Sequence, residues 1–300
     1  MKGGKTNMRY FDRLHPIAAG FYFVTVLLIA MMTMDPVMIT VCYLTGVCFC
    51  GILIGLRKLL SSLAYSIPLM LMVALTNPIF VHRGETILFF LNDNPVTVES
   101  IVYGVFAAMM IMSVFYWCRC YGEIMTSDKF VYLFGRVVPK LSLVFSMVLG
   151  FLPKMKRRFR EIDEAQHALG IYSTRGYVDR IRSKMRVLSI LLTGSLENSV
   201  DSADSMRARG YGLRGRSSYA NYRIAHGDVL YLILTAVLGA AIIVLILLDV
   251  SSFSYYPVID RGEASVLTYI LYGALTLLTG ASIVTEVKEN ILWRYLRSKI

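Results

Sequence analysis

Six stretches of the chain are apolar over about 20 residues, the length that an α-helix needs to cross a lipid bilayer. They cover residues 14–34, 36–56, 59–80, 100–120, 229–249 and 266–285. A single water-soluble core cannot hold this much apolar surface, so lipid must cover part of it. The pattern therefore predicts an all-α integral membrane protein with about six transmembrane helices.

The charges between these stretches predict how the chain is oriented in the membrane. Arg57 and Lys58 separate the second stretch from the third, and Lys and Arg also gather at both ends of the chain. Residues 82–99 and 250–264 carry more acidic side chains than cations. Because cytoplasmic loops collect Lys and Arg, we expect both termini inside and these two loops outside. The first stretch is too long for a signal-peptide core, so we expect an uncleaved first span.

A shorter apolar run, residues 141–152, predicts a helix that does not cross the membrane. It would be only about 18 Å long, and cationic clusters flank it on both sides. A span would place one of these clusters on the wrong side of the bilayer. We therefore expect a helix at the cytoplasmic interface that continues past Pro153 into the charged run that follows.

A second amphipathic helix is predicted further along the chain, where apolar residues recur at steps of three and four. This apolar stripe consists of Ile181, Met185, Leu188, Leu192, Leu196, Val200 and Ala203. Charged and hydroxyl side chains form the opposite face. Gly194 lies inside the helix, where glycine costs about 1 kcal/mol relative to alanine, and we expect it to mark a close crossing with another helix.

Glycines are predicted to end both amphipathic helices. Gly210 can take the positive φ of a C-terminal cap, which leaves Arg207 and Arg209 in the last turn, near unpaired carbonyl groups. A similar segment, residues 164–170 (EAQHALG), precedes residues 204–210 (DSMRARG) by forty positions. From spacing alone, Arg209 is either a solvated cation that complements the helix dipole or a docking group.

The distribution of charged residues along the sequence divides the chain into three parts. Residues 154–223 hold fifteen Lys and Arg residues against seven Asp and Glu. We expect an N-terminal membrane domain over residues 1–125, a cytoplasmic coupling-helix domain over residues 126–225 and a C-terminal membrane hairpin over residues 226–300. The net charge of +11 is a feature of the membrane topology, so no nucleic-acid partner is expected.

The sequence shows no pattern of an enzyme or of a metal site. It has no phosphate-binding loop, no His-Glu-x-x-His and no intramembrane carboxylate pair. The five cysteines lie inside apolar runs, and no two of the four histidines have the spacing of ligands on one helix face. We therefore expect no metal and no cofactor bound by this chain.

Two short motifs resemble a known family. Residues 205–211 (SMRARGY) resemble the end of the second coupling helix in the transmembrane T component, EcfT, of energy-coupling factor (ECF) transporters, a family related to the cobalt-transport permease subunit. Residues 151–154 (FLPK), with Ala165 and Gln166, resemble the first coupling helix. The resemblance covers residues 126–211 and extends to the flanking spans in general character only.

The resemblance implies that the chain is the coupling subunit of an ECF-type ABC importer in a prokaryotic cell membrane. Two cytoplasmic ABC ATPases would bind ATP and Mg²⁺ and hydrolyse the ATP. A separate membrane protein, the S component, would capture a vitamin or a metal ion. This chain would transmit the motion of the ATPases to the S component.

The resemblance also assigns the docking residues. Ala208, Arg209 and Gly210 would form the ATPase-docking motif beside Arg207, with Arg209 paired to an acidic residue in a groove of the ATPase. A guanidinium group suits this role because it binds carboxylates through two parallel hydrogen bonds.

The first docking motif departs from the family pattern. Ala168 and Gly170 match the motif, but Leu169 stands where the family has arginine. Arg175 is a candidate substitute for that cation, although it lies six residues further along the chain. We therefore expect the first contact to be weaker than the second.

An S component is itself a membrane protein, so the apolar faces of the two helices would form a platform for it. The predicted platform residues are Leu141, Val144, Val148, Leu188, Leu192, Leu196 and Val200. The alternative is that these faces pack on each other and on the spans.

Two other functions are compatible with a basic membrane protein. A lipid-modifying enzyme would bind a phosphate headgroup through Arg175, Arg180 and Arg207, but it needs a nucleophile or metal carboxylates near the interface. An ordinary ABC permease subunit would need its own substrate path and would dock through a short loop helix.

Overall fold

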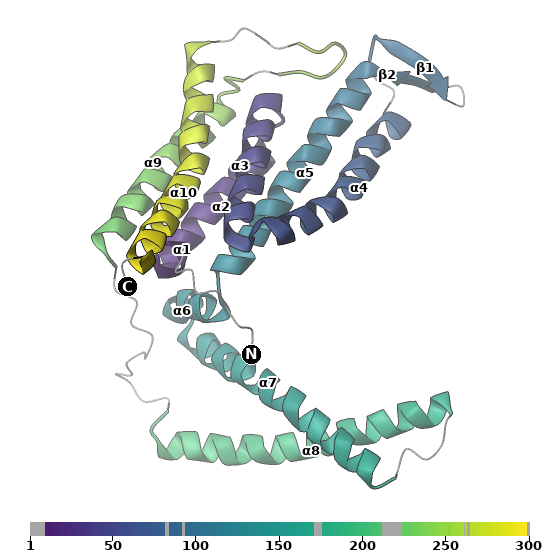
Figure 1. Cartoon of the computed structure of the whole chain (residues 1–300), viewed down its shortest axis with the longest axis vertical. Helices are drawn as coiled ribbons and strands as arrows, with labels where there is room; N and C mark the ends of the chain where they lie inside the picture. Colours follow the sequence, from purple (N-terminus) through teal and green to yellow (C-terminus); the bar gives the residue numbers. More distant parts are fainter. Residues whose placement is uncertain are drawn as a thin grey trace. The chain divides into compact units, whose positions relative to one another are not determined.

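The computed structural model describes residues 10–81, 84–91, 94–170, 176–211, 224–251, 253–260, 262 and 265–298. Over these residues the chain is almost entirely helical (Figure 1). It divides into two compact units, one formed by Met1–Thr126 with Arg223–Ile300 and the other by Ser127–Tyr222. The second unit falls within the region 126–225 that the charge pattern marks off.

Unit 1 contains the apolar helices. They are α1 (Tyr10–Arg13), α2 (Pro16–Met32), α3 (Pro36–Ile54), α4 (Leu56–Phe80), α5 (Val98–Ile124), α9 (His226–Leu247) and α10 (Val266–Ser298). In the described part of the chain, five helices are long and apolar enough to cross a membrane: α3, α4, α5, α9 and α10. The protein is thus a multi-pass membrane protein, and α2, with 17 residues, lies at the short end of the range for a span.

The predicted spans coincide with these helices to within a few residues at each end, except at the C-terminal end of α10. Helix α2, the first predicted span, begins at Pro16 and not at residue 14, because Pro suits the first turn of a helix and the side chain of His15 accepts a hydrogen bond from the N–H of Ile17. Helix α10 continues beyond the predicted end at residue 285 to Ser298. Its Glu286 carboxylate accepts a hydrogen bond from the N–H of Tyr10 at 3.1 Å, which ties α1 to α10.

One predicted loop contains a β-hairpin. Residues 82–99 include the antiparallel strands β1 (Ile87–Leu91) and β2 (Asn94–Thr97). The hairpin lies within the predicted connection between α4 and α5, and the run Ile-Leu-Phe-Phe-Leu forms a strand there because it has strong β-propensity. The residues between the two strands lie outside the described residues.

The core of unit 1 is an aromatic cluster that joins α2, α3 and α5. Tyr22, Phe23, Phe49 and Trp117 are fully buried. The Phe49 and Trp117 rings stack with their centroids 5.7 Å apart, and the Trp117 indole N–H donates to the Cys42 carbonyl at 3.1 Å. This cluster fixes α5 against α3, so the ends of α5 have defined positions within the unit.

Unit 2 contains α6 (Ser127–Val137), α7 (Pro139–Ala168) and α8 (Tyr177–Ala208). Helix α7 runs through Pro153 without a break, which confirms the prediction that the apolar run 141–152 continues into the charged segment. The Ser142 hydroxyl donates to the Val131 carbonyl at 3.1 Å and connects α7 to α6.

Candidate functional site

The predicted docking and platform residues all lie on α7 and α8 or in the caps at their C-terminal ends, and the two helices cross one another (Figure 1). Lys184 Nζ lies 2.6 Å from Asp163 Oδ2, and the Ser195 hydroxyl lies 3.1 Å from the Met155 sulfur. Asp163 follows Met155 in α7, whereas its partner Lys184 precedes Ser195 in α8. The two helices therefore run in opposite senses through their contact.

The face of α8 that packs in this unit is not the predicted apolar stripe. Its buried residues recur at every fourth position and are Ser183, Val187, Leu191 and Ser195. The small serines at the two ends of this face allow close approach of the helices. Gly194 does not mark the crossing, and that expectation was wrong, because a Cβ atom there would meet nothing within 4 Å.

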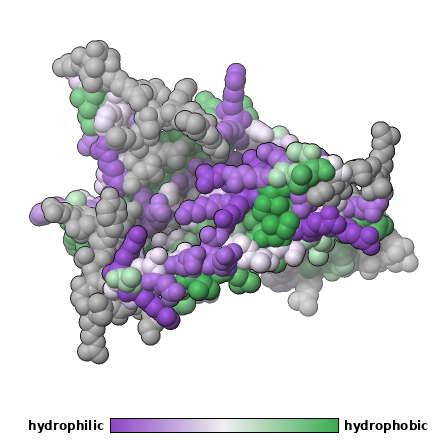
Figure 2. Space-filling model, turned by 90° about the horizontal axis from the view of Figure 1, so that it is seen from below, coloured by the Kyte–Doolittle hydropathy of each residue, from purple (hydrophilic) through white to green (hydrophobic). Residues whose placement is uncertain are grey.

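The predicted platform residues of α8 are exposed because a different face packs against α7. Leu188 is 39% exposed, and the values for Leu192, Leu196 and Val200 are 51%, 69% and 62%. Figure 2 shows the helices of this unit from below, where hydrophilic side chains predominate and small hydrophobic patches lie between them. The exposed apolar side chains of this stripe are available for contact with lipid or with another protein.

The first half of α7 is apolar and exposed as well. Leu141, Val144 and Val148 are all exposed, as are Phe145 and Leu152 on neighbouring turns. Exposed side chains here point in several directions around the helix, as expected for a segment in contact with lipid or with a membrane protein.

Helix α8 ends as the sequence predicts. Its last helical residue is Ala208, Arg209 is the C-cap and Gly210 has φ +74°. The N–H of Gly210 donates to the carbonyl of Arg207 at 3.0 Å, and that of Tyr211 donates to Met206 at 3.0 Å. These two bonds form a Schellman motif, in which a glycine of positive φ lets the chain satisfy the last carbonyl groups.

Helix α7 ends in the same way with a different side chain. Its last helical residue is Ala168, Leu169 is the C-cap and Gly170 has φ +71°. The N–H of Gly170 donates to the His167 carbonyl at 3.1 Å. Leu169 is 75% exposed, so the apolar residue in place of the family's arginine projects from the helix end. Arg175, the candidate substitute, lies outside the described residues.

The two arginines at the end of α8 have different electrostatic surroundings. Arg207 forms an ion pair of 3.8 Å with Asp204 one turn earlier. Arg209 is exposed and forms no ion pair with any residue that the structure describes. A surface pair such as Arg207–Asp204 contributes little to stability, but it offsets the charge of Arg207. Arg209 is therefore the cation at this tip that has its full charge available for a partner.

Sequence reasoning missed the contact that holds the two helices together. Ser183, Val187, Leu191 and Ser195 repeat at intervals of four on a side of α8 that belongs neither to the predicted apolar stripe nor to the predicted polar face. A row of serines and apolar residues repeated at this spacing is a signal of helix packing that the longer apolar stripe concealed. The Lys184–Asp163 ion pair carries no local sequence signal, because its members lie on different helices.

Two observations concern the class of protein to which the chain belongs: its candidate metal ligands and its similarity to a known family. No cluster of three or more His, Cys, Asp or Glu side chains in the described part of the chain could hold a metal ion. The family described as CbiQ, cobalt transport protein, matches residues 13–219, a range that includes α2 to α8 and both helix tips. No individual curated protein matches the chain.

Proposed function

This chain belongs to the CbiQ cobalt transport protein family, the family of EcfT-type T components and of transport permeases, and on that basis we propose that it is the coupling subunit of an ECF-type ABC importer. Two cytoplasmic ABC ATPases bind and hydrolyse ATP with Mg²⁺, and an S component binds a vitamin or a metal ion. This chain binds no cofactor and transmits the motion between them. It lies in a prokaryotic cell membrane with both termini cytoplasmic.

The exposed end of α8 is the observation that carries the proposal. Ser195, which contacts Met155 of α7, is the last buried residue of α8, and residues 196–208 extend beyond it for about 20 Å of helix. Side chains along this extension are exposed except for the partly buried Met206. A rigid helix that projects beyond its own packing contact can enter a groove of another protein.

Arg209 supports docking of this end into an acidic groove. It is the C-cap, its backbone is held by the glycine after it, and its guanidinium has no carboxylate partner in the described structure. A desolvated carboxylate in an ATPase groove would accept two hydrogen bonds from it. Ala208 and Gly210 on either side are small and allow the groove to approach the helix end closely.

The crossing supports transmission of movement between the two tips. Val187 is fully buried at the crossing, and the Lys184–Asp163 ion pair lies toward the end of α7. Because packed helices resist continuous deformation, displacement of one tip moves the other helix as well. The exposed platform residues on both helices contact an S component in the membrane and transmit this movement to it.

Position-specific cross-linking tests the proposal. A photoreactive amino acid at Leu169 or Tyr211, next to the tips, should capture an ABC ATPase in cells, and one at Leu196 on the platform should capture a small membrane protein. Ser189, an exposed residue on the polar face of α8, is the matched control and should capture neither. Capture of an ATPase at none of the tip positions would refute the coupling role.

A further inference from the structure

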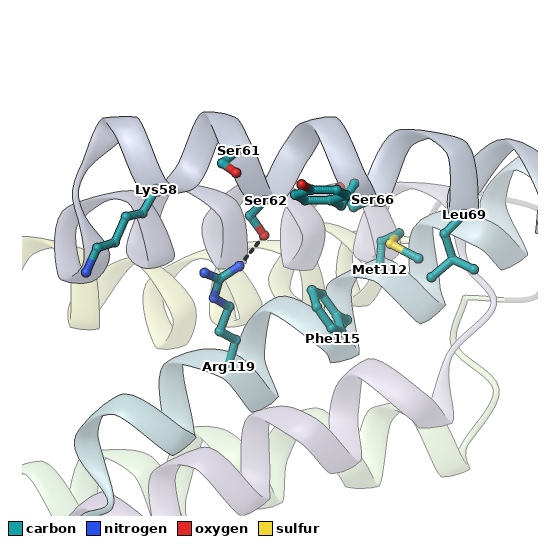
Figure 3. Close-up of a pocket in the computed structure, with 9 residues that line it drawn as sticks. Lys58, Ser61, Ser62, Ser66, Leu69, Met112, Phe115 and Arg119 are labelled. Atoms are coloured by element: carbon teal, nitrogen blue, oxygen red, sulfur yellow. Dashed lines mark hydrogen bonds between the residues drawn. The ribbon is translucent and has the colours of Figure 1, made fainter. Parts of the chain in front are cut away.

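A cleft of about 440 Å³ lies between α4 and α5 in unit 1 (Figure 3). Helix α4 contributes Lys58, Ser61 and Ser62 to its walls, and α5 contributes Arg119. Both helices are long and apolar enough to cross a membrane, so the cleft is formed by membrane-spanning segments. No step of the proposed coupling mechanism uses it.

One end of the cleft is cationic. The Arg119 guanidinium points toward α4 and donates a hydrogen bond to the Ser62 hydroxyl, and Lys58 lies toward the same end (Figure 3). Neither cation forms an ion pair with a carboxylate of the described residues. Two cations and the Ser61 hydroxyl line this end of the cleft, so an anion is the complementary occupant.

The other end of the cleft is apolar. Tyr65 is 81% exposed, Leu69 is 48% exposed on the same helix, and Phe115 faces them from α5 with 46% of its surface exposed. The Ser66 hydroxyl, which also borders the cleft, is hydrogen-bonded to Tyr116 at 2.7 Å. Only 11% of the apolar window of α4 is buried, so the walls of this end are open to the membrane interior.

The cleft therefore changes from cationic to apolar along about 16 Å of α4, from Lys58 to Leu69. We propose that it binds an anionic phospholipid. The phosphate lies between Lys58 and Arg119 and accepts hydrogen bonds from them and from Ser61. The acyl chain runs along Tyr65, Leu69 and Phe115.

The geometry favours a lipid over a free phosphate ion. A free ion would use only the cationic end and would leave the apolar end, which opens toward hydrocarbon, without a function. Positive side chains at the end of a spanning helix also lie at headgroup depth, where anionic phosphodiesters are abundant. A bidentate guanidinium contact gives the site a preference for phosphate that is not neutralised by choline.

The binding test uses the full chain purified in detergent and native mass spectrometry with dioleoyl phosphatidylglycerol or dioleoyl phosphatidylcholine. We expect phosphatidylglycerol to bind more tightly, and Arg119→Gln to weaken its binding about tenfold, the effect of losing one charge-assisted hydrogen-bonded contact. Lys58→Gln should weaken it several-fold. Arg57→Gln removes the neighbouring cation, which does not line the cleft, and should change binding little.

Several results would overturn the proposal. Equal binding of the two lipids, or an Arg57→Gln loss as large as that of Arg119→Gln, would show diffuse charge attraction in place of a site. Displacement of phosphatidylglycerol by equimolar inorganic phosphate would identify a free-anion site. Arg119→Lys keeps the charge but loses the guanidinium fork, so it should recover part of the binding that Arg119→Gln loses. This partial recovery separates lost recognition from lost folding.

Cross-linking in cells distinguishes a lipid from a protein in the cleft. A photoreactive amino acid at Tyr65 should form an adduct with the mass of a phospholipid. Capture of another membrane protein at this position instead would overturn the proposal. The test concerns unit 1 and is independent of whether the tips of α7 and α8 bind an ATPase.

Discussion

The ends of α7 and α8 have the same backbone conformation, but the residue before the capping glycine differs between them. Gly170 and Gly210 have φ values of +71° and +74°, and each donates its N–H to the carbonyl three residues before it. The residue before the glycine is Leu169 at one tip and Arg209 at the other. Both are exposed, so neither side chain is needed to hold its own helix end in place.

This difference separates the shape of a helix end from its binding chemistry. Glycine provides the shape, because an L-residue at the same φ has a steric penalty. The preceding residue provides the chemistry, since a guanidinium pairs with carboxylates and a leucine side chain does not. The two tips are therefore expected to contribute unequally to binding of an ATPase pair, although their backbones are alike.

Charge reversal at the stronger tip should have the largest effect. Arg209→Glu places a carboxylate against an acidic groove, and we expect ATPase binding to fall about a hundredfold or more. Pull-down of the ATPases with the purified chain measures this. Arg186→Glu is the matched control, since it reverses an exposed charge on α8 away from the tip, and it should leave the pull-down nearly unchanged. Undiminished recovery with Arg209→Glu would contradict the docking assignment.

Truncation of the two side chains should show their inequality directly. Arg209→Ala removes a charge-assisted pair and should weaken ATPase binding about tenfold. Leu169→Ala removes an exposed apolar side chain and should weaken it less than about twofold. Titration of each variant with the ATPases gives the two dissociation constants. Equal losses would mean that leucine has a docking role equal to that of arginine.

Substitution of each capping glycine by alanine should show that both helix ends depend on a residue with positive φ. Gly170→Ala and Gly210→Ala force a Cβ atom into the left-handed region, and each should destabilise its helix end by about 1 kcal/mol. Gly194→Ala is the control inside α8, where a Cβ atom meets open space, and it should stabilise the helix by about 1 kcal/mol. Thermal unfolding followed by far-ultraviolet circular dichroism compares them. A destabilising Gly194→Ala would show a contact at that position.

The smallest effect is expected at the ion pair between the two helices. Lys184 is 45% exposed and Asp163 is 21% exposed in their side chains, so solvent screens the pair. Lys184→Ala should lower the free energy of unfolding by less than about 1 kcal/mol, and by less at high salt. A loss of several kcal/mol in the same unfolding measurement would assign the ion pair a larger role than the buried Val187 contact beside it.

The features that were predicted correctly are those that depend only on residues close to one another in the sequence. The spans follow from the lengths of apolar runs, and the helix ends at Ala168 and Ala208 follow from the glycines two positions later. Residues 87–91 are a partial exception, since their β-propensity competes with the turn residues around them. The docking roles of Leu169 and Arg209 stay predictions that the experiments above test.

Tertiary packing alone decided which face of α8 is buried. The sequence by itself determined that α8 is a helix with a stripe of large apolar residues, because periodicity is a local property. Which face packs depends on the shape of the surface that α7 presents, and there Ser183, Val187, Leu191 and Ser195 fit closely while the larger side chains stay outside. The same holds for the cleft, since Lys58 and Arg119 are brought together only by the packing of α4 on α5.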